Sequence, residues 1–517
     1  MITGITAFKR VVLARSILII EETSMNIVGK NRLNIMWVLL VIGITALIAS
    51  ACASSAEARW DGPVTTIYIG HNWPIEMAVH RDDASDLSRV ERENMVARRN
   101  AERDVLNRMG VRIEWVQYGD LNEEIPNGTS AGQKLDLVRI VGLQQAHLIS
   151  SNLIQPIDQF AHLFEDDESA WMFWPQVFGN NYFINNILRI GADAPLVYNI
   201  GMLNQVPALQ EGGRTVLPVH LWQQGRWTWS EFENYLQKVH DHWTAEWEGR
   251  MAWGSNHTTA ALLAIHSNGG HIYNENGLGF ASDEAKEAVA FIDRLMARRL
   301  LRNPDIRAGT SVQDDHSDQW RFQWGHSVFA SLQQWLAGGM VDSFNERRER
   351  MGIVPFPRPD WKDANDPLYR QVNDARDAYG VPFNVDSERA ELAIRAFREY
   401  TIAYYRRISG SNNALDYVKS DQGLRAAAGR MFIDTANRDY GPAMLEALRY
   451  LGSDHQINEY AKNVGIWDFW GTAVLGDSLY HISPASSYET WADQQLPVAQ
   501  EMIDQVWRDV NPDGPVQ

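Results

Sequence analysis

The stretch of the chain that comes nearest to a catalytic motif is Gly-Thr-Ser-Ala-Gly at residues 128–132. It matches G-x-S-x-G, in which a sharp turn between a buried strand and a helix presents a nucleophilic serine hydroxyl. The preceding residues 120–127 read as a polar loop broken by Pro126, so the required strand is missing from the pattern. We therefore interpret the match as a chance one and expect no nucleophile at Ser130.

Histidine and acidic side chains offer two candidate metal sites, and both are weak. The acidic cluster at residues 314–318, which contains His316, lacks the glycine of an EF-hand loop, so a solvated acidic loop explains it better. His240 and His242 lie two positions apart, so on a helix their side chains face different sides. We expect no bound metal and no cofactor.

The sequence also lacks the compact signatures of several enzyme classes. It contains no H-E-x-x-H, no phosphate-binding P-loop, no C-x-x-C and no G-x-G-x-x-G. Carboxylate pairs, which glycoside hydrolases use, can be drawn anywhere among the 65 Asp and Glu residues, so the sequence nominates no pair. We therefore expect a protein that is not an enzyme, with a surface polysaccharide lyase or glycosidase as the alternative.

Tryptophan is the residue type that most invites a binding function, because the chain holds 20 of them. An indole offers a large flat face with one polar handle, which suits both a hydrophobic core and a platform for a sugar ring. Packing must account for most of these side chains. A minority is therefore expected to contact a ligand.

The charge of the chain limits its partners. Residues 1–51 carry five basic and two acidic side chains, so without them the net charge falls from −18 to about −21. A surface this acidic argues against nucleic acid and anionic lipid headgroups as partners. With 45% hydrophobic residues, the chain is globular and not a disordered acidic segment.

The N-terminal region has the order of an export signal. Lys30 and Arg32 precede residues 35–48, an uncharged run that is too short to span a bilayer, which takes about 20 apolar residues. Small residues follow, and then Cys52, the only cysteine of the chain. The stretch 48–52 resembles a bacterial lipobox, although Ala49 stands where leucine is usual.

This resemblance implies that residues 1–51 are a signal peptide and that Cys52 is lipidated. We expect residues 52–62 to tether the domain to the outer face of a membrane, and Met25 to be the true translation start. A lone cysteine cannot form an internal disulfide, which also favours lipidation. Two acyl chains or more would hold the domain durably, whereas one alone binds a membrane only marginally.

The order of the elements that follow indicates an α/β fold. Residues 64–70 form an expected strand, and residues 89–109 an amphipathic helix that Gly110 ends. Residues 111–115 form a second expected strand, because apolar and charged residues alternate there. This is the β-α-β pattern of a parallel sheet covered by helices. The 466 residues from Cys52 onward are too many for one core, so we expect two lobes.

The same pattern recurs along the chain, without internal repeats. Ser230, Ser282 and either Asp386 or Ser387 are the expected N-caps of three helices. Further strands are predicted at residues 135–141, 194–198, 328–332, 352–356 and 379–383. Residues 303–318 read as a polar loop.

Several segments in order resemble the extracellular solute-binding proteins of carbohydrate ABC transporters, the group that includes maltose-binding protein. They keep their order over nearly 400 residues, and residues 403–460 match least. Leu-Asp-Leu-Val at 135–138, Pro-Leu-Val-Tyr-Asn at 195–199 and Trp-Thr-Trp-Ser-Glu-Phe at 227–232 carry the resemblance in the first half. The later segments that carry it are 261–270, 322–335, 352–357, 379–384 and 467–470.

This resemblance implies the type II periplasmic-binding-protein fold, with two α/β lobes joined by crossover hinge strands that close on a solute. Residues 63–194 are then mainly lobe 1, residues 195–378 mainly lobe 2, and residues 379–460 mainly a return to lobe 1. Residues 461–517 supply a C-terminal aromatic segment and helix.

The resemblance also implies which residues contact the ligand. Trp335 and Trp470 fall where the family places aromatic platforms. The other matched positions are Trp73, Gln144, Asp193, Asn256, His257 and Trp467. The loop around Gln144 lacks the charged pair of maltose-binding protein, and residues 258–259 are threonines in place of its aromatic, so the ligand is expected not to be maltose.

The function that this resemblance implies is that of a monomeric, lipid-anchored receptor on the extracytoplasmic surface. It would capture a carbohydrate, most simply an oligosaccharide, and deliver it to the permease subunits of an ABC transporter. A peptide or another polar solute is an alternative ligand. A ligand-sensing subunit of a membrane kinase is an alternative role that differs only in the partner.

Overall fold

The structure is a computed structural model. The structure describes residues 60–72, 89–130, 132–173, 176–186, 195–246, 251–255, 257–301, 321–331, 341–366, 369–374, 378–411, 413–431, 433–452, 456–459, 465–466, 469–470 and 487–510. Two compact units divide the chain, and the smaller contains residues 60–63 and 107–110 of the described part. Cys52 and the predicted signal and tether up to residue 59 lie outside the described residues.

In the smaller unit, an indole ring packs over a glycine. The indole nitrogen of Trp60 donates a hydrogen bond to the carbonyl of Pro63 over 3.0 Å. Gly110 has φ of +66°, and a Cβ placed there would clash with the indole nitrogen of Trp60. Both the left-handed backbone and the close ring therefore require glycine at this position, which confirms the predicted end of the preceding helix.

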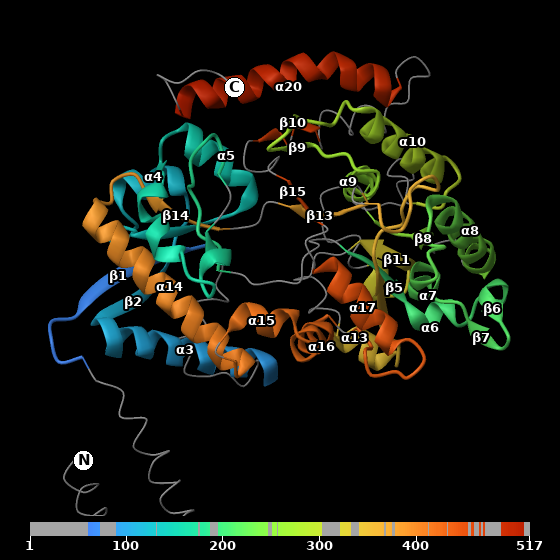
Figure 1. The fold of residues 1–517 in the computed structure, drawn as a ribbon, viewed down its shortest axis with the longest axis horizontal. Coiled ribbons are helices and arrows are strands. Elements are labelled where there is room, and N and C mark those ends of the chain that lie inside the picture. Colours follow the sequence, from blue (N-terminus) through green and yellow to red (C-terminus); the bar gives the residue numbers. More distant parts are fainter. Residues whose placement is uncertain are drawn as a thin grey trace, which may run out of the picture. The chain divides into compact units, whose positions relative to one another are not determined.

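The larger unit contains a five-stranded sheet with the strand order β2-β1-β3-β14-β4. Figure 1 labels its strands β1, β2 and β14. Strands β2 and β3 lie on either side of β1, and both are parallel to it. Strand β14 runs antiparallel to its neighbours β3 and β4. The strands are β1 (Thr65–His71), β2 (Val111–Gln117), β3 (Leu137–Ile140), β4 (Ile154–Gln155) and β14 (Ala378–Pro382).

The alternation of side chains in β2 explains why these residues form a strand. Val111, Ile113 and Trp115 are buried, and the intervening Arg112 is exposed, so one face of the strand meets the core. Helix α3 (Arg89–Met109) connects β1 to β2, with the bounds predicted from the sequence. Because two parallel strands need such a crossover, the predicted β-α-β unit is confirmed.

A second sheet has the strand order β12-β5-β11-β8, and a parallel bridge from Trp253 to Leu301 extends it beyond β8. Strand β5 runs antiparallel to both of its neighbours, while β8 and β11 are parallel. The strands are β5 (Leu196–Asn199), β8 (Met251–Trp253), β11 (Ser327–Ser331) and β12 (Met351–Val354).

The two sheets therefore share one topology. Counted from the Leu301 bridge, the second sheet runs bridge-β8-β11-β5-β12, which matches β2-β1-β3-β14-β4 position by position. In each sheet, the fourth strand is the antiparallel one. The chain enters the second sheet through β5, directly after the first group of strands, and returns to the first sheet through β14. These two strands are the crossovers that the sequence predicted.

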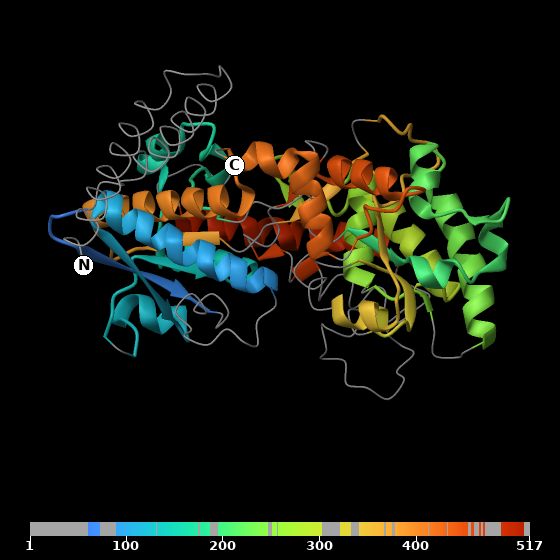
Figure 2. The same ribbon diagram turned by 90° about the horizontal axis from the view of Figure 1, so that it is seen from below.

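Helices cover both sheets. The longer ones are α5 (Gly142–Ser150), α8 (Trp229–Glu246), α9 (His257–Ser267), α10 (Asp283–Ala297), α14 (Ser387–Ser409), α16 (Asp421–Arg430), α17 (Gly441–Leu451) and α20 (Tyr488–Val510). Helices α3 and α14 lie side by side (Figure 2). Short helices are α4 (Leu121–Asn127), α6 (Ile200–Leu203), α7 (Pro218–Gln223), α13 (Val341–Glu346) and α15 (Ala414–Lys419), with 3-10 turns η2 (Asp158–Phe164), η3 (Ala170–Met172) and η4 (Pro207–Leu209).

The remaining strands form small two-stranded pairs. Strand β13 (Gln371–Asp374) is parallel to β15 (Gln456–Glu459). The hairpins are β6 (Gln210–Glu211) with β7 (Arg214–Thr215) and β9 (Tyr273–Asn274) with β10 (Gly277–Leu278). No helix in the described part of the chain has both the length and the apolar character that a membrane span requires.

Three predicted helix starts can be compared with the caps in the structure. Ser282 caps α10 through its hydroxyl, which accepts from the amide of Ala285, and Asp386 caps α14. The prediction for Ser230 was wrong. Helix α8 (Trp229–Glu246) already includes Ser230, and the Thr228 hydroxyl accepts from the amide of Glu231 in the position of the cap. The Ser230 hydroxyl donates to Asp360 instead.

The predicted polar loop at residues 120–127 was also wrong, because most of it is helix α4. The carboxylate of Asp120 accepts from the amide of Asn122 and caps the helix, while Leu121 and Ile125, four positions apart, are buried on one face. Pro126 lies near the C-terminal end, where the short helix stops within two residues. Gly128 follows with φ of +84°.

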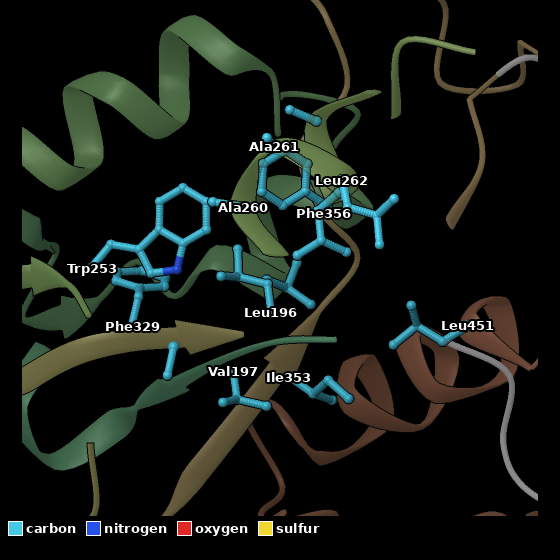
Figure 3. Packing of buried hydrophobic residues seen from close by; sticks show 14 of the residues in the cluster. Leu196, Val197, Trp253, Ala260, Ala261, Leu262, Phe329, Ile353, Phe356 and Leu451 are labelled. Atoms are coloured by element: carbon cyan, nitrogen blue, oxygen red, sulfur yellow. The ribbon is translucent and has the colours of Figure 1, made fainter. Parts of the chain in front are cut away.

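Aromatic and aliphatic side chains pack together in the core around the second sheet (Figure 3). The ring of Trp253 from β8 lies 5.3 Å from that of Phe232 and 5.7 Å from that of Phe356, and all three are buried. Leu451 at the end of α17 belongs to the same cluster as Ile353 of β12. Burial of each such side chain contributes about 1.5–3 kcal/mol to stability.

The segment 379–460 is divided between the two sheets. Strand β14 and helix α14 contact β3 of the first sheet. Helix α17 contacts β12 of the second sheet and the neighbouring helix α7. The predicted assignment of this segment mainly to lobe 1 stays a prediction. The other lobe boundaries stay predictions, and the polar loop at 303–318 lies outside the described residues.

Candidate functional site

The carboxyl ends of parallel strands are where open α/β sheets bind ligands. In the first sheet, β1 ends at His71 and is followed by Asn72, while β3 leads directly into helix α5. In the second sheet, β8 leads into α9, and β11 ends beside it at Ser331. We define these two places as the first edge and the second edge, and build the candidate site from them.

Buried polar side chains line the first edge. His71 is fully buried, with its ring 6.4 Å from that of Trp115 and 6.5 Å from that of Tyr379. The Nη1 of Arg139 donates to the Oδ1 of Asn72 over 3.0 Å. Arg139 is only 8% exposed, so its guanidinium and the neighbouring amide form a set of fixed donors beside the end of β1.

Helix α5 points its amino end at the same edge. Its N-cap is Val141, which offers no side-chain acceptor to the amides of the first turn. Gln144 is exposed, whereas the next residue, Gln145, is only 1% exposed. Gln145 lies three and four positions before the buried Leu148 and Ile149, and this places it on the inward face of the helix.

Serine hydroxyls line the second edge. The Ser255 hydroxyl accepts a hydrogen bond from the backbone amide of Ser331, and this joins the segment after β8 to the end of β11. Ser255 and Ser331 are 1% and 9% exposed. The Oγ of Ser331 has no hydrogen-bond partner within the described part of the chain. A buried hydroxyl in this state is well suited to bind a polar ligand atom.

Two features fix the backbone at the second edge. A Cβ on Gly254 would lie 2.6 Å from the Ser327 hydroxyl, so only glycine allows this close approach. His257 is the first residue of α9 and is 7% exposed. Every residue of α9 from Ala260 to Ser267 is buried, which holds the helix and its amino end rigidly against the sheet.

Among the predicted ligand contacts, three can be placed. Gln144 lies at the first edge and His257 at the second, and the ligand roles of both stay predictions. Trp470 is fully buried in the core, so its ring presents no open face in this structure. The other predicted contacts lie outside the described residues: Trp73, Asp193, Asn256, Trp335 and Trp467.

Trp470 has the contacts of a packing residue. Its indole nitrogen donates to the hydroxyl of Tyr488 over 3.2 Å, and that hydroxyl donates to the carbonyl of Phe280 over 2.8 Å. Burial raises the pKa of Tyr488, so the phenol stays protonated and can serve as a donor. The polar handle of Trp470 is therefore used within the core.

The catalytic and metal patterns can be compared with the structure as well. After α4, the amide of Gly132 donates to the carbonyl of Thr129, and Ser130 is exposed. The strand that a nucleophile elbow needs does not precede these residues. Among the described residues, no group of three or more His, Cys, Asp or Glu side chains could hold a metal ion. The acidic cluster at 314–318 lies outside them.

Sequence reasoning missed most of the polar residues at the two edges. These are His71, Arg139, Gln145, Ser255 and Ser331. For Gln145, the helical spacing to two apolar residues was an available signal. For the two serines, the only signal was their place at the ends of short apolar strands, because neither belongs to a motif.

The fold matches two solved binding proteins. The GacH receptor of Streptomyces glaucescens, solved unliganded and with acarbose or an acarbose homolog, superposes with a TM-score of 0.51 at 12% identity, covering 86% of this chain and 99% of that one. A solute-binding protein of an ABC transporter from Thermotoga lettingae, bound to α-D-tagatose, gives 0.51 at 12% identity and covers 86% and 100%. No protein-family model and no curated protein sequence matches the chain.

These superpositions agree with the topology of the sheets. Both sheets have the same strand order, and each receives its antiparallel strand from the segment that crosses from the other. The predicted fold class of two α/β lobes with crossover strands is confirmed. The chain therefore has the type II periplasmic-binding-protein fold of the ABC-transporter solute-binding proteins that its sequence segments resemble.

Proposed function

We propose that this protein is an extracytoplasmic solute-binding protein that captures a carbohydrate for import by an ABC transporter. One observation carries the proposal: the chain contains two sheets with the same strand order, and each has buried polar side chains at the carboxyl ends of its parallel strands. Such edges bind ligands in α/β proteins. The chain passes from the first sheet to the second through β5 and returns through β14, so the two sheets are joined by these crossovers. A hinge motion of the two lobes would bend the chain at these crossovers.

The side chains at the two edges suit a neutral, hydroxylated ligand. Ser331 offers a buried hydroxyl, and Arg139 and Asn72 offer guanidinium and amide donors at the first edge. Sugars need such donors and acceptors together with flat apolar faces. The predicted contacts Trp73, Trp335 and Trp467 would provide those faces, with Gln144, Asp193, Asn256 and His257 as polar partners.

The ligands of the two structural neighbours support a carbohydrate. One neighbour is described in complex with acarbose and the other with α-D-tagatose. We propose an oligosaccharide for this chain, delivered by a monomer to ABC permease subunits. Anchoring through a lipidated Cys52 would keep the binding domain close to that membrane partner.

Small-angle X-ray scattering tests the proposal through the closure of the two lobes. The purified chain is measured alone and with maltotriose, cellotriose, xylotriose or a mixed tripeptide. Binding should reduce the radius of gyration for at least one sugar, because a ligand shifts the protein toward the state that binds it better. If only the peptide causes contraction, the ligand is a peptide and not a sugar. No contraction with any sugar would contradict the proposal.

Two variants separate ligand binding from other causes of contraction. Ser331→Ala should weaken the affinity for the active sugar about fivefold to tenfold, since one hydrogen bond to a buried hydroxyl is lost. Ser130→Ala, an exposed serine in the turn after α4, should leave the affinity unchanged. Chromatography of the sugar after incubation should show it intact, and cleaved products would favour the glycan-active enzyme instead.

A further inference from the structure

A pocket of about 220 Å³ is lined by residues of strand β2 and of the helices that pack beside it, and its wall residue Trp115 also contacts His71 of the first edge. Strand β2, helices α3 and α14 and Asn186 form its walls, and no lining residue comes from a strand of the second sheet. Figure 2 shows α3 and α14 side by side. The side chains that matter to its chemistry are Arg98, Trp115, Tyr400, Thr401, Tyr404 and Tyr405.

Aromatic rings wall the pocket because four lining positions fall on one face of α14. Tyr400 and Tyr404, four residues apart, lie with their rings 6.5 Å apart and nearly parallel, at 12°. The ring of Trp115 meets that of Tyr400 edge-on at 5.4 Å, and the ring of Tyr405 meets that of Tyr404 at 5.2 Å. The pocket is therefore bounded by ring faces and edges.

Hydrogen bonds hold two of these rings in place. The indole nitrogen of Trp115 donates to the carboxylate of Glu102 over 2.7 Å. The hydroxyl of Tyr405 donates to the carbonyl of Asn186 over 3.2 Å. Because their polar ends are bonded to the protein, both rings are fixed in orientation and cannot easily collapse into the space.

One polar atom of the lining has no partner. Thr401 is 1% exposed, and its hydroxyl oxygen makes no hydrogen bond to any residue that the structure describes. A buried hydroxyl left in this state costs about 1–3 kcal/mol. A threonine inside a helix can usually bond to a carbonyl of the preceding turn, and here it does not. A ligand oxygen in the pocket would satisfy it.

The charge of the lining limits the classes of ligand that the pocket can bind. The guanidinium of Arg98 lies 5.7 Å from the centre of the Tyr404 ring, so a positive charge already occupies the aromatic wall. A cationic ligand is therefore disfavoured, and an oxygen-rich one is favoured. The volume is below the range of about 300–1,000 Å³ that drug-sized ligands occupy, so it fits one small ring.

We propose that this pocket is a second ligand site, which binds a single hydroxylated ring of pyranose size, either a neutral monosaccharide or a sugar acid. The apolar C–H faces of the ring lie against Tyr404 and Trp115, and a ring oxygen or hydroxyl bonds to Thr401. Arg98 pairs with a carboxylate where the sugar carries one. Because no lining residue comes from a strand of the second sheet, occupancy of the site does not depend on the lobe closure of the proposed function.

Ligand-observed NMR and calorimetry with the full chain test this site, with D-glucose and D-glucuronate as the probes. Thr401→Val keeps the shape of the side chain and removes the hydroxyl. It should weaken binding of the probe about fivefold to tenfold, because one neutral hydrogen bond is lost. Arg98→Gln should weaken binding of glucuronate and not of glucose. Comparing the two affinities of the original chain then shows whether the pocket prefers the sugar acid or the neutral sugar.

Controls separate this proposal from the proposed function. Ser331→Ala, at the second edge, should leave probe binding in the pocket unchanged, whereas Thr401→Val should leave the sugar-induced contraction in scattering unchanged. If Thr401→Val does not fold, Tyr404→Leu, at a partly exposed position, gives the same loss of affinity. Unchanged affinity in a folded variant, or no binding of either probe, would overturn the second site and leave the proposed function standing.

Discussion

Arg389 makes a two-pronged ion pair with Asp136. Its Nε and Nη2 donate to the two carboxylate oxygens, each over 2.7 Å. The Asp136 carboxylate also accepts from the backbone amide of Tyr68. The pair ties the first turn of α14 to β1 and to the residue before β3, so it fixes the helix that carries the tyrosines of the pocket.

The stability of the first lobe should depend on this pair. The Asp136 side chain is 6% exposed and that of Arg389 is 28% exposed, so we expect Asp136→Asn to lower the free energy of unfolding by about 2 kcal/mol. Urea denaturation gives the value. The matched control is Glu391→Gln, which removes an ion pair between largely exposed side chains of the same helix and should cost less than about 0.5 kcal/mol. Equal effects would contradict the role of Asp136.

Trp470 offers a test between packing and ligand contact. Trp470→Ala should lower the free energy of unfolding by about 3–5 kcal/mol, since it empties a fully buried site and removes the hydrogen bond to Tyr488. Thermal unfolding measures this loss. Trp324→Ala is the control, because that indole is 48% exposed. Unchanged stability combined with weaker sugar affinity would instead support the predicted platform at Trp470, a role that stays a prediction.

Asp293 should make the stability of the protein depend on pH. Burial raises the pKa of its carboxyl group to about 7, and its Oδ1 has no partner among the described residues. The folded protein therefore holds this proton up to about pH 7, whereas the unfolded chain releases it near pH 4. Between these values the folded state binds more protons, so the contribution of Asp293 to stability falls as pH rises and is not regained above pH 7.

The variant Asp293→Asn should remove this pH dependence. Relative to the original chain, it should gain roughly 1–3 kcal/mol in the free energy of unfolding at pH 8 and little at pH 4. Denaturation curves across this range measure the difference. Asp167→Asn, at an exposed aspartate, should leave the pH profile of stability as it was. A constant difference between Asp293→Asn and the original chain at all pH values would refute the assignment.

Lipidation of Cys52 is predicted to anchor the protein to a membrane. In cells that process lipoproteins, mass spectrometry should find an acylated Cys52 as the mature N-terminus, and Cys52→Ser should release the protein from the membrane fraction. An unmodified cysteine in the membrane-bound protein would contradict the anchor. Peptides from residues 1–24 would contradict translation from Met25.

Much of the fold could be predicted from local patterns. Helix α3 has the predicted bounds, and alternation in β2 and the cap at Ser282 were read correctly because each depends on neighbours in sequence. The error at Ser230 has a tertiary cause, since Asp360, distant in sequence, binds the hydroxyl that local reasoning assigned to the cap. Helix α4 was missed because Pro126 was given more weight than the spacing of Leu121 and Ile125.

The candidate site was harder to predict. Ser255 and Ser331 are 76 positions apart and meet only because β8 and β11 are neighbours in the second sheet. Tryptophan count suggested sugar platforms, but Trp470 shows that an indole with a partner such as Tyr488 is equally suited to the core. Residue type alone does not separate these two roles, whereas burial and the partner of the indole nitrogen do.

A thermal-shift screen against an oligosaccharide panel tests the central claim, carbohydrate binding, most directly. A sugar at about 100 times its dissociation constant should stabilise the folded protein by about 2.7 kcal/mol, and the shift should grow with sugar concentration. The account predicts such a shift for at least one oligosaccharide and a smaller one for the same sugar with Ser331→Ala. A flat response to every carbohydrate, with a shift for peptides or other polar solutes, would contradict it.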